Sequence, residues 1–380
     1  MNDKLIECVY SKKCGGCDYC GIPYDEQLQK KHKELVRLLG KFGKVDHIIP
    51  ADNVYHYRNK VVGTFGFTRK NEYISGVYEK NSHRIVKIDD CLITDKTANA
   101  IILSIRNLLR SFKIRTYNED TGYGLLRHVL VRVGRNSGSI LVVLVCASPI
   151  FPSKNNFVKA LRKLYPQIES IVLNINDRKT SMILGERNIN LYGPGYIEDT
   201  LCGLKFRISP QSFYQVNHEQ TEKLYGLVAD YAGLAGKERV LDAYSGIGTI
   251  GMTLASGAKE VISVELNEKA HRDACRNAEI NNIHNVRFFC EDATKFIETV
   301  DDIDVIIMDP PRSGSTTRFI DAVAKLQPDK VIYVSCGPDS LARDLAYFKK
   351  KGYAVRKITP VDMFCFTKHV ETVVSLSRKC

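Results

Sequence analysis

From Ser209 onward, short apolar runs alternate strictly with helical patterns, and this alternation restricts the fold more than any other feature of the sequence. Strands are expected at 239–243, 261–265, 286–290, 305–309 and 331–335. Two last strand patterns, at 354–358 and 372–376, have no segment of helical length between them. Alternating units build a parallel sheet with helices on both faces. We therefore predict an α/β fold over residues 209–380, a Rossmann-like doubly wound sheet closed by an antiparallel pair.

Residues 1–208 lack that regularity, and an α+β domain is expected there. The stretch 55–78 alternates and is rich in Val, Tyr, Phe and Thr, which is typical of strands. Asn136-Ser137-Gly138 separates two apolar stretches and predicts a hairpin. The other expected elements are helices at 94–112 and 158–165 and a strand at 170–175. No local motif in this half indicates a function, and we place the domain boundary between Leu204 and Gln215.

The charge balance favours a polyanionic partner. The formal net charge is +12 and the isoelectric point is about 9.0, so nucleic acid is favoured over a membrane surface, although many soluble enzymes are equally basic. The stretch 25–44 has leucines at helical spacing among lysines, which predicts an amphipathic helix with a basic outer face. That face either contacts RNA or is simply solvated, and the sequence favours neither. No feature indicates an obligate protein partner.

The distribution of cysteines and apolar residues indicates the compartment. The most apolar run, 140–150, is too short to span a bilayer, and no charged-then-apolar leader opens the chain. A cytoplasmic protein is therefore expected. Its twelve cysteines should be thiols or metal ligands, because disulfides are rare in that compartment.

Four cysteines stand among the first twenty residues. Cys8, Cys14 and Cys17 have spacings at which three thiolates can share one metal centre. By spacing alone, either Cys20 or Cys91 would supply the fourth ligand, and both zinc and an iron–sulfur cluster fit. The spacing typical of radical S-adenosylmethionine enzymes is absent.

The first strand of the C-terminal half leads into a glycine turn, Asp242-Ala243-Tyr244-Ser245-Gly246-Ile247-Gly248-Thr249. Glycines there let a ligand approach the backbone closely. Glu265 ends the next strand, where an acid commonly binds ribose hydroxyls, and Asp292 follows the third strand, where an adenine amino group is held. With Asp309-Pro310-Pro311, this ordered series resembles S-adenosylmethionine-dependent methyltransferases. A nucleoside-binding domain of another kind is the alternative.

Cys336 is the candidate nucleophile. It stands at the C-terminal tip of the strand 331–335, before Gly337-Pro338, and ligands of open α/β sheets bind at such tips. Asp309 ends the preceding strand and Glu371 opens the last one. C5 of uracil is a poor nucleophile, but addition of a thiolate to C6 makes C5 reactive, and a base must then remove the C5 proton. Both faces of the base must be reached, which requires a flipped or unpaired nucleotide.

Five ordered motifs, SFYQVN, DAYSGIGT, DPPR, YVSCGP and DMFCFTKHVE, resemble the RNA uracil-5 methyltransferases of ribosomal and transfer RNA. This resemblance implies Cys336 as nucleophile and Glu371 as base. It also implies that the methyl donor or the uracil is bound by Gln215, Tyr244, Thr249, Glu265 and Asp309. The alternatives without a catalytic role are a buried thiol at a strand end for Cys336 and a surface acid on an edge strand for Glu371.

The same resemblance selects Cys8, Cys14, Cys17 and Cys91 as ligands of a [4Fe–4S] cluster, with Cys20 as a spare. The cluster is typical of the ribosomal branch, so 23S ribosomal RNA is the expected substrate and transfer RNA the alternative. Because Cys8 stands so near Met1, the small β-barrel that many relatives carry ahead of the cysteines is not expected here.

The sequence departs from the family pattern, which usually has Asn at the position of Gly337 and Pro at that of Cys365. Two other functions compete with uracil-5 methylation. An amino-methyltransferase would use the DPPR segment and would not need Cys336. A non-catalytic iron–sulfur RNA-binding protein would no longer bind the methyl donor.

Overall fold

The computed structural model describes residues 7–379, which form two compact units. The first comprises the chain up to Gly21 with Asn53–Thr200 and Arg207–Gln211, and the second comprises Ile22–Asp52, Leu201–Phe206 and the chain from Ser212 onward. Residues 22–52 thus pack with the second unit, although the sequence pattern grouped them with the N-terminal half. No helix within 7–379 combines the length and apolar character that crossing a membrane requires.

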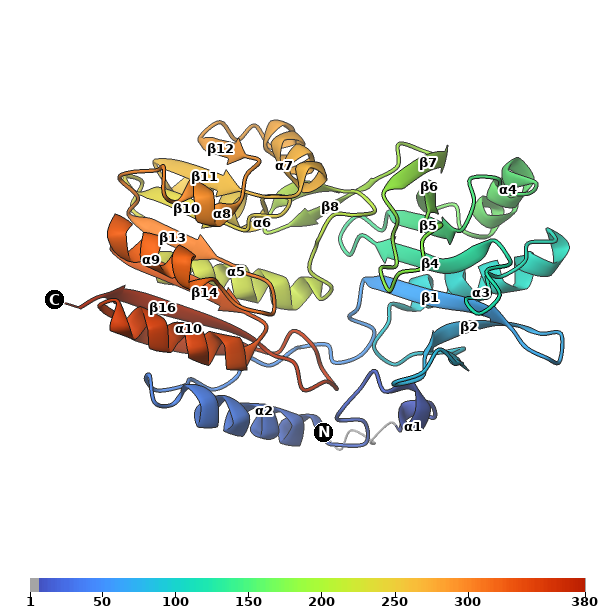
Figure 1. Ribbon diagram of the computed structural model, residues 1–380, viewed down its shortest axis with the longest axis horizontal. Coiled ribbons are helices and arrows are strands. Elements are labelled where there is room, and N and C mark those ends of the chain that lie inside the picture. The colour runs from blue at the N-terminus through green and yellow to red at the C-terminus, as the bar shows by residue number, and fades with distance from the viewer. Residues whose placement is uncertain (1–6, 380) are drawn as a thin grey trace. The chain divides into compact units, whose positions relative to one another are not determined.

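The first unit contains a seven-stranded sheet in the order β3-β2-β1-β4-β5-β6-β7. Its elements are α1 (Ser11–Cys14), β1 (Lys60–Phe67), β2 (Tyr73–Tyr78), β3 (Ile85–Lys87), α3 (Lys96–Ser111), β4 (Leu126–Val133), β5 (Ile140–Cys146), α4 (Lys154–Leu164), β6 (Ile168–Ile175) and β7 (Arg187–Tyr192). The predicted hairpin is β4–β5, in which Val133 lies opposite Ile140. Helix α3 packs against β1, β2 and β4, and α4 packs against β7 (Figure 1).

Side-chain alternation gives this sheet two different faces. Val61 and Phe65 of β1 and Val129 and Val131 of β4 are buried in the core that also contains the apolar stripe of α3. Because successive strand residues point to opposite faces, Val62 and Thr64 of β1, and Leu130 and His128 opposite them on β4, point away from α3. A hairpin of β8 (Ile197–Leu201) and β9 (Leu204–Ile208) follows this sheet in the chain.

The second unit has the predicted Rossmann-like sheet, in the order β12-β11-β10-β13-β14-β16-β15. Its strands are β10 (Arg239–Ala243), β11 (Glu260–Val264), β12 (Val286–Phe289), β13 (Val305–Met308), β14 (Lys330–Ser335), β15 (Tyr353–Val361) and β16 (Glu371–Arg378). Strands β10 to β14 pair in parallel, and β16 pairs antiparallel with both β14 and β15. The last strand of the chain therefore lies inside the sheet, between β14 and β15.

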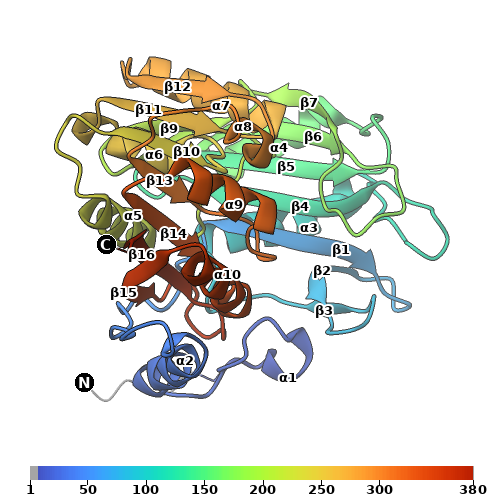
Figure 2. The ribbon, with the colours of Figure 1, turned by 60° about the vertical axis from the view of Figure 1, so that its left-hand side comes forward.

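Helices cover both faces of this sheet. They are α2 (Tyr24–Leu39), α5 (His218–Ala232), α6 (Thr249–Leu254), α7 (Glu268–Ile280), α8 (Ala293–Phe296), α9 (Thr317–Leu326) and α10 (Pro338–Lys350), with a 3-10 turn at Ala255–Gly257. Helices α5 and α6 pack together on one face, whereas α9 and α10 pack on the other (Figure 1). Helix α2 lies beside α10 (Figure 2).

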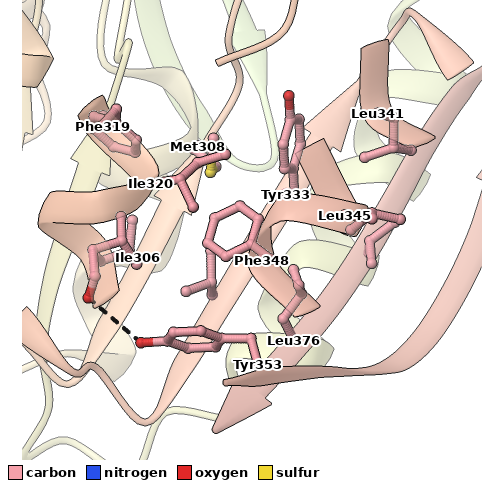
Figure 3. Packing of buried hydrophobic residues seen from close by; sticks show 14 of the residues in the cluster. Ile306, Met308, Phe319, Ile320, Tyr333, Leu341, Leu345, Phe348, Tyr353 and Leu376 are labelled. Carbon is pink, nitrogen blue, oxygen red and sulfur yellow. Dashed lines mark hydrogen bonds between the residues drawn. The ribbon is translucent and has the colours of Figure 1, made fainter. Parts of the chain in front are cut away.

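The core of the second unit lies between the sheet and α9 and α10. Figure 3 shows Phe348 of α10 and Tyr353 of β15 packed edge to face, with ring centroids 5.7 Å apart. Ile306 and Met308 of β13 and Tyr333 of β14 point into the same cluster and are fully buried. Burying such side chains contributes roughly 1.5–3 kcal/mol each. A well-packed core therefore supports the C-terminal ends of these strands.

Candidate active site

The ladder between β14 and β16 brings Cys336 and Glu371 together. Ser335 pairs with Thr372 at the end of this ladder, so Cys336 and Glu371 occupy the next positions on the two strands. Glu371 is only 4% exposed, whereas Cys336 is partly exposed. Because β16 lies inside the sheet, Glu371 is not a surface acid on an edge strand. Nor is Cys336 sealed in the core.

Asp309 and Arg312 complete this group. Asp309 follows β13, the parallel neighbour of β14, and the Arg312 side chain lies within hydrogen-bonding distance of the Cys336 thiol. The Ser340 hydroxyl donates to the Arg312 carbonyl at 2.9 Å, which ties the DPPR turn to the start of α10. The sequence pattern included Arg312 only as the last residue of the DPPR motif and predicted no role for it. Its place in that motif was the signal that could have indicated a role at the site.

Gly337 is required by this packing. A Cβ atom at this position would lie 2.8 Å from the Ser340 hydroxyl and 2.9 Å from the Arg312 carbonyl oxygen. Both distances are shorter than real Cβ contacts. The departure from the family's usual Asn at Gly337 therefore matches a turn that leaves no room for a side chain.

Burial and mutual repulsion raise the pKa values of the three acidic groups. Burial raises the pKa of Asp309 to about 7. Burial, and then the Asp309 charge, raise the pKa of Glu371 to about 8, against the opposing Arg312 charge. Burial, Glu371 and Asp309 also raise the pKa of the Cys336 thiol, which Arg312 lowers. A carboxylate with a pKa near neutrality is suited to general-base catalysis, and a cation beside a thiol favours the thiolate.

The glycine turn after β10 is stabilised by Glu265. The Gly246 N–H donates to Glu265 Oε2 at 2.9 Å, and the Asn267 N–H donates to Oε1 at 2.7 Å. Tyr244 has φ of 67°, a left-handed conformation that is uncommon outside glycine and that occurs often at ligand sites. Each carboxylate oxygen keeps a further lone pair, so Glu265 can also accept a ribose hydroxyl.

Asp242 connects the turn to α6. Its Oδ2 accepts the Gly251 N–H at 2.9 Å, and a Cβ on Gly251 would lie 2.7 Å from the same oxygen. Burial raises the pKa of Asp242 to about 7, with smaller contributions from the charges of Asp309 and Glu265 and against the opposing effect of the Gly251 hydrogen bond. The donor turn and the Cys336 group are therefore electrostatically connected through Asp309.

Three other predicted ligands lie in the same unit. The Thr249 hydroxyl is hydrogen-bonded to the Tyr225 hydroxyl at 2.8 Å. Asp292 caps α8 by accepting hydrogen bonds from the backbone N–H groups of Thr294 and Lys295. Burial raises the pKa of Tyr244, and the Asp292 charge contributes a smaller increase. Gln215 is 6% exposed and lies just before α5. The sequence did not indicate Tyr225.

A buried ion pair holds the segment that leads to Glu371. Lys31 Nζ donates to Asp362 Oδ1 at 2.6 Å and to the Phe364 carbonyl at 3.1 Å, and both charged side chains are fully buried. The Tyr24 hydroxyl donates to Asp362 Oδ2 at 2.9 Å. Lys31 is one of the lysines of the stretch 25–44 that were predicted to form a basic outer face, and for Lys31 this prediction is wrong. Its position four residues before the buried Leu35 was the signal that could have indicated this.

The N-terminal cysteines share one neighbourhood in the first unit. Burial, together with smaller contributions from Cys91, Cys14, Cys20 and Cys8, raises the pKa of the Cys17 thiol to about 12. Cys20 is thus as much a part of this group as Cys91. Within residues 7–379, however, no three His, Cys, Asp or Glu side chains are arranged to hold a metal ion.

Known proteins that are similar to this chain are RNA methyltransferases. A family model described as tRNA (uracil-5-)-methyltransferase matches residues 23–379. An uncharacterized RNA methyltransferase of Halalkalibacterium halodurans is 40% identical over 98% of this chain and 83% of its own length. An uncharacterized RNA methyltransferase of Clostridium acetobutylicum is 41% identical, with the same coverage of both chains.

A solved structure is also similar. The tRNA (uracil-54, C5)-methyltransferase of Pyrococcus abyssi, in complex with S-adenosyl-L-homocysteine, has a TM-score of 0.81 and 31% identity, over 95% of this chain and 85% of that one. The chain therefore belongs to the tRNA (uracil-5-)-methyltransferase family and is an S-adenosylmethionine-dependent RNA methyltransferase.

Proposed function

We propose that this enzyme methylates C5 of a specific uridine in 23S ribosomal RNA through a covalent bond between Cys336 and C6. The observation that carries this proposal is the position of a partly exposed thiol beside a buried carboxylate at the end of the β14–β16 ladder, with a guanidinium at the thiol. A methyltransferase acting on an amino group would need neither the thiol nor the second carboxylate.

The steps follow from the chemistry of these groups. The Cys336 thiolate, stabilised by Arg312, adds to C6, and the electron pair of the C5–C6 bond moves onto C5 and O4. Bound S-adenosylmethionine would supply the methyl group to C5, and the electron pair of the broken S–CH3 bond would stay on the sulfur of S-adenosylhomocysteine. Glu371 removes the C5 proton, the pair of the C–H bond re-forms the C5–C6 double bond, and the thiolate leaves C6. Asp242, Glu265 and the glycine turn hold the donor at the strand ends.

The choice of RNA depends on two opposing observations. The N-terminal cysteine group favours a ribosomal substrate, as in the ribosomal branch that the sequence resembles. The similarity to the Pyrococcus abyssi transfer-RNA enzyme favours the alternative, in which this chain methylates a transfer-RNA uridine. The two substrates differ in the RNA and share the chemistry of Cys336 and Glu371.

Mechanism-based trapping tests both parts. Purified enzyme with S-adenosylmethionine is incubated with 23S ribosomal RNA fragments, and separately with transfer RNA, each containing 5-fluorouridine. A base cannot remove the fluorine on C5 as it removes a proton, so the last step is blocked. The Cys336 adduct should therefore persist on a denaturing gel. Cys336→Ala should lose the band, and Cys290→Ala, which removes an exposed thiol of the same unit, should keep it. An adduct with transfer RNA alone would select the alternative, and methylation without any adduct would exclude the covalent mechanism.

We further propose that Cys8, Cys14, Cys17 and Cys91 bind a [4Fe–4S] cluster. Each thiolate of such a cluster binds a different iron atom, so the four sulfurs need not converge on one point as they do around a single ion. The group supplies soft thiolate donors in the required number, with Cys20 as a competing fourth ligand. Methyl transfer moves no net electrons, so we infer a structural role for the cluster and not a redox role. The cluster would fasten the N-terminal segment to the residues before α3.

Metal analysis tests the cluster independently of activity. Anaerobically purified protein should contain iron and acid-labile sulfide in equal amounts. Cys91→Ser should lose most of the iron, whereas Cys20→Ser should keep it. The reverse pattern would make Cys20 the fourth ligand, and bound zinc would replace the cluster with a mononuclear site.

A further inference from the structure

The sheet of the first unit carries a cavity to which no function has been assigned. It has a volume of about 580 Å³, within the range of small-molecule sites. Its floor includes Thr64 and His128, which pair across β1 and β4 and lie on the sheet face away from α3. Its sides are the loop that contains Tyr117 and Glu119 and the loop that contains Lys179 to Ile183.

Tyr117 and Arg127 form one wall. The Arg127 guanidinium lies over the Tyr117 ring, 4.7 Å from the centroid, and the Arg127 side chain is only 3% exposed. Its Nη1 donates to the carbonyls of Asn176 and Arg178, both at 2.8 Å. These bonds fix the opposite loop, so the cavity is formed before any ligand binds. An aromatic ring with a guanidinium plane is a common surface for a stacked nucleobase.

Hydrogen-bonding groups converge on the same cavity. Burial, assisted by the neighbouring Arg127 charge, lowers the pKa of His128 to about 4, so the imidazole is neutral at pH 7. Its Nδ1 is bonded to the Thr64 hydroxyl at 3.2 Å, which leaves Nε2 for a ligand. Lys179, Thr180 and Ser181, which carry an ammonium group and two hydroxyls, line the opposite side.

Glu119 gives the cavity an ionised acceptor. Its Oε2 lies 3.0 Å from His83 Nδ1, and the Tyr78 hydroxyl also donates to the carboxylate. Burial raises the pKa of Glu119, but these bonds and the Arg127 charge outweigh burial, so the net pKa is lowered. A cavity of pure phosphate-binding character would not place a carboxylate among its cations. This mixture of flat surface, donors and acceptors matches a heterocyclic base that carries both donors and acceptors.

We propose that this cavity binds one unpaired nucleotide of the RNA substrate, distinct from the uridine that is methylated. The base stacks on the Tyr117 ring, which the Arg127 guanidinium supports, its edge meets His128 and Glu119, and Lys179 contacts the backbone phosphate. Such a site would select an RNA by a second extrahelical nucleotide, at a place far along the chain from Cys336. The inference deepens the proposed function and rests on RNA being the substrate.

Crosslinking and binding test the site together. The full-length enzyme is irradiated at 254 nm with unmodified ribosomal RNA and transfer RNA, digested with nuclease and protease, and analysed by mass spectrometry. Nucleotide-bearing peptides that contain Tyr117 or Tyr78 are expected. Tyr117→Ala should raise KM for the methylated RNA about tenfold with little change in kcat, as loss of one stacked base predicts. Tyr117→Phe should restore the wild-type KM.

A matched control is available in the same unit. Tyr192 also lies under an arginine, with Arg162 3.7 Å from its ring centroid, but it does not line the cavity. Tyr192→Ala should leave KM unchanged. Crosslinks confined to other peptides, or equal KM values for Tyr117→Ala and wild type, would overturn the site while methylation continues. Absence of methylation in the wild type would instead count against the proposed function, and the crosslinks would still report on the cavity.

Discussion

Cys336 and Glu371 stand on neighbouring strands, one position beyond the last pair of the β14–β16 ladder, Ser335 and Thr372. The proposed nucleophile and the proposed base are therefore positioned by two neighbouring strands of the sheet and not by a long loop. Sites built on such elements hold their geometry more tightly than sites on loops. The same closeness makes the Glu371 charge raise the pKa of the Cys336 thiol, so the two groups titrate together.

Replacing Glu371 by Gln should separate the two halves of the reaction. The amide cannot remove the C5 proton, but it also removes a negative charge beside Cys336, so adduct formation continues. We expect turnover to fall by about 10²–10⁴-fold and a covalent enzyme–RNA complex to accumulate with ordinary uridine. A denaturing gel with labelled RNA measures both. Glu279→Gln, at an exposed acid of the same unit, should behave as wild type. Full turnover by Glu371→Gln would show that another group is the base.

The rate of methylation should depend on pH through Glu371. A carboxyl whose pKa is raised to about 8 is protonated below that pH, so kcat should increase between about pH 7 and pH 9 as the base form appears. Asp309→Asn removes a charge that raises the pKa values of both Glu371 and Cys336. The profile of this variant should therefore move to lower pH, even if its maximal rate is reduced. A profile that stays in place or moves to higher pH would contradict this account.

The parallel part of the second unit could be predicted because each strand is a continuous apolar run between helical patterns. Periodicity also indicated the β4–β5 hairpin and α3. It could not indicate that β16 enters the sheet between β14 and β15, because chain order alone does not decide which strands pair. The burial of Glu371 follows from that pairing, so it could not be predicted from the sequence.

Four strands, β3, β7, β8 and β9, were not predicted. Each has only three to six residues and includes charged or polar side chains among the apolar ones, so its pattern cannot be distinguished from that of a loop. The buried charge of Lys31 was missed for a different reason. A lysine is assigned to the surface by default, and only its partner Asp362, far along the chain, makes burial possible.

The Lys31–Asp362 pair should contribute strongly to stability. Lys31→Met leaves the Asp362 carboxylate buried without its cation, and breaking a buried pair in this way costs about 3–5 kcal/mol. Arg37→Ala in the same helix removes an exposed pair with Glu34 and should leave the free energy of unfolding almost unchanged, because water and salt screen such a pair. Urea denaturation measures both. Adding Asp362→Asn to Lys31→Met should recover part of the loss, and equal effects of the two single variants would contradict the assignment.

Binding of the methyl donor should depend on the absence of a side chain at Gly251. A Cβ there would lie 2.7 Å from Asp242 Oδ2 and 2.8 Å from the Ser263 hydroxyl, so Gly251→Ala must displace the start of α6 and the turn before it. We expect the affinity for S-adenosylmethionine, measured by calorimetry, to fall at least about tenfold, since about 1.4 kcal/mol suffices. Gly226→Ala places its methyl in open space within α5 and should stabilise the protein by about 0.5–1 kcal/mol without changing this affinity. If both variants bind the donor equally well, the glycine turn does not form the donor site.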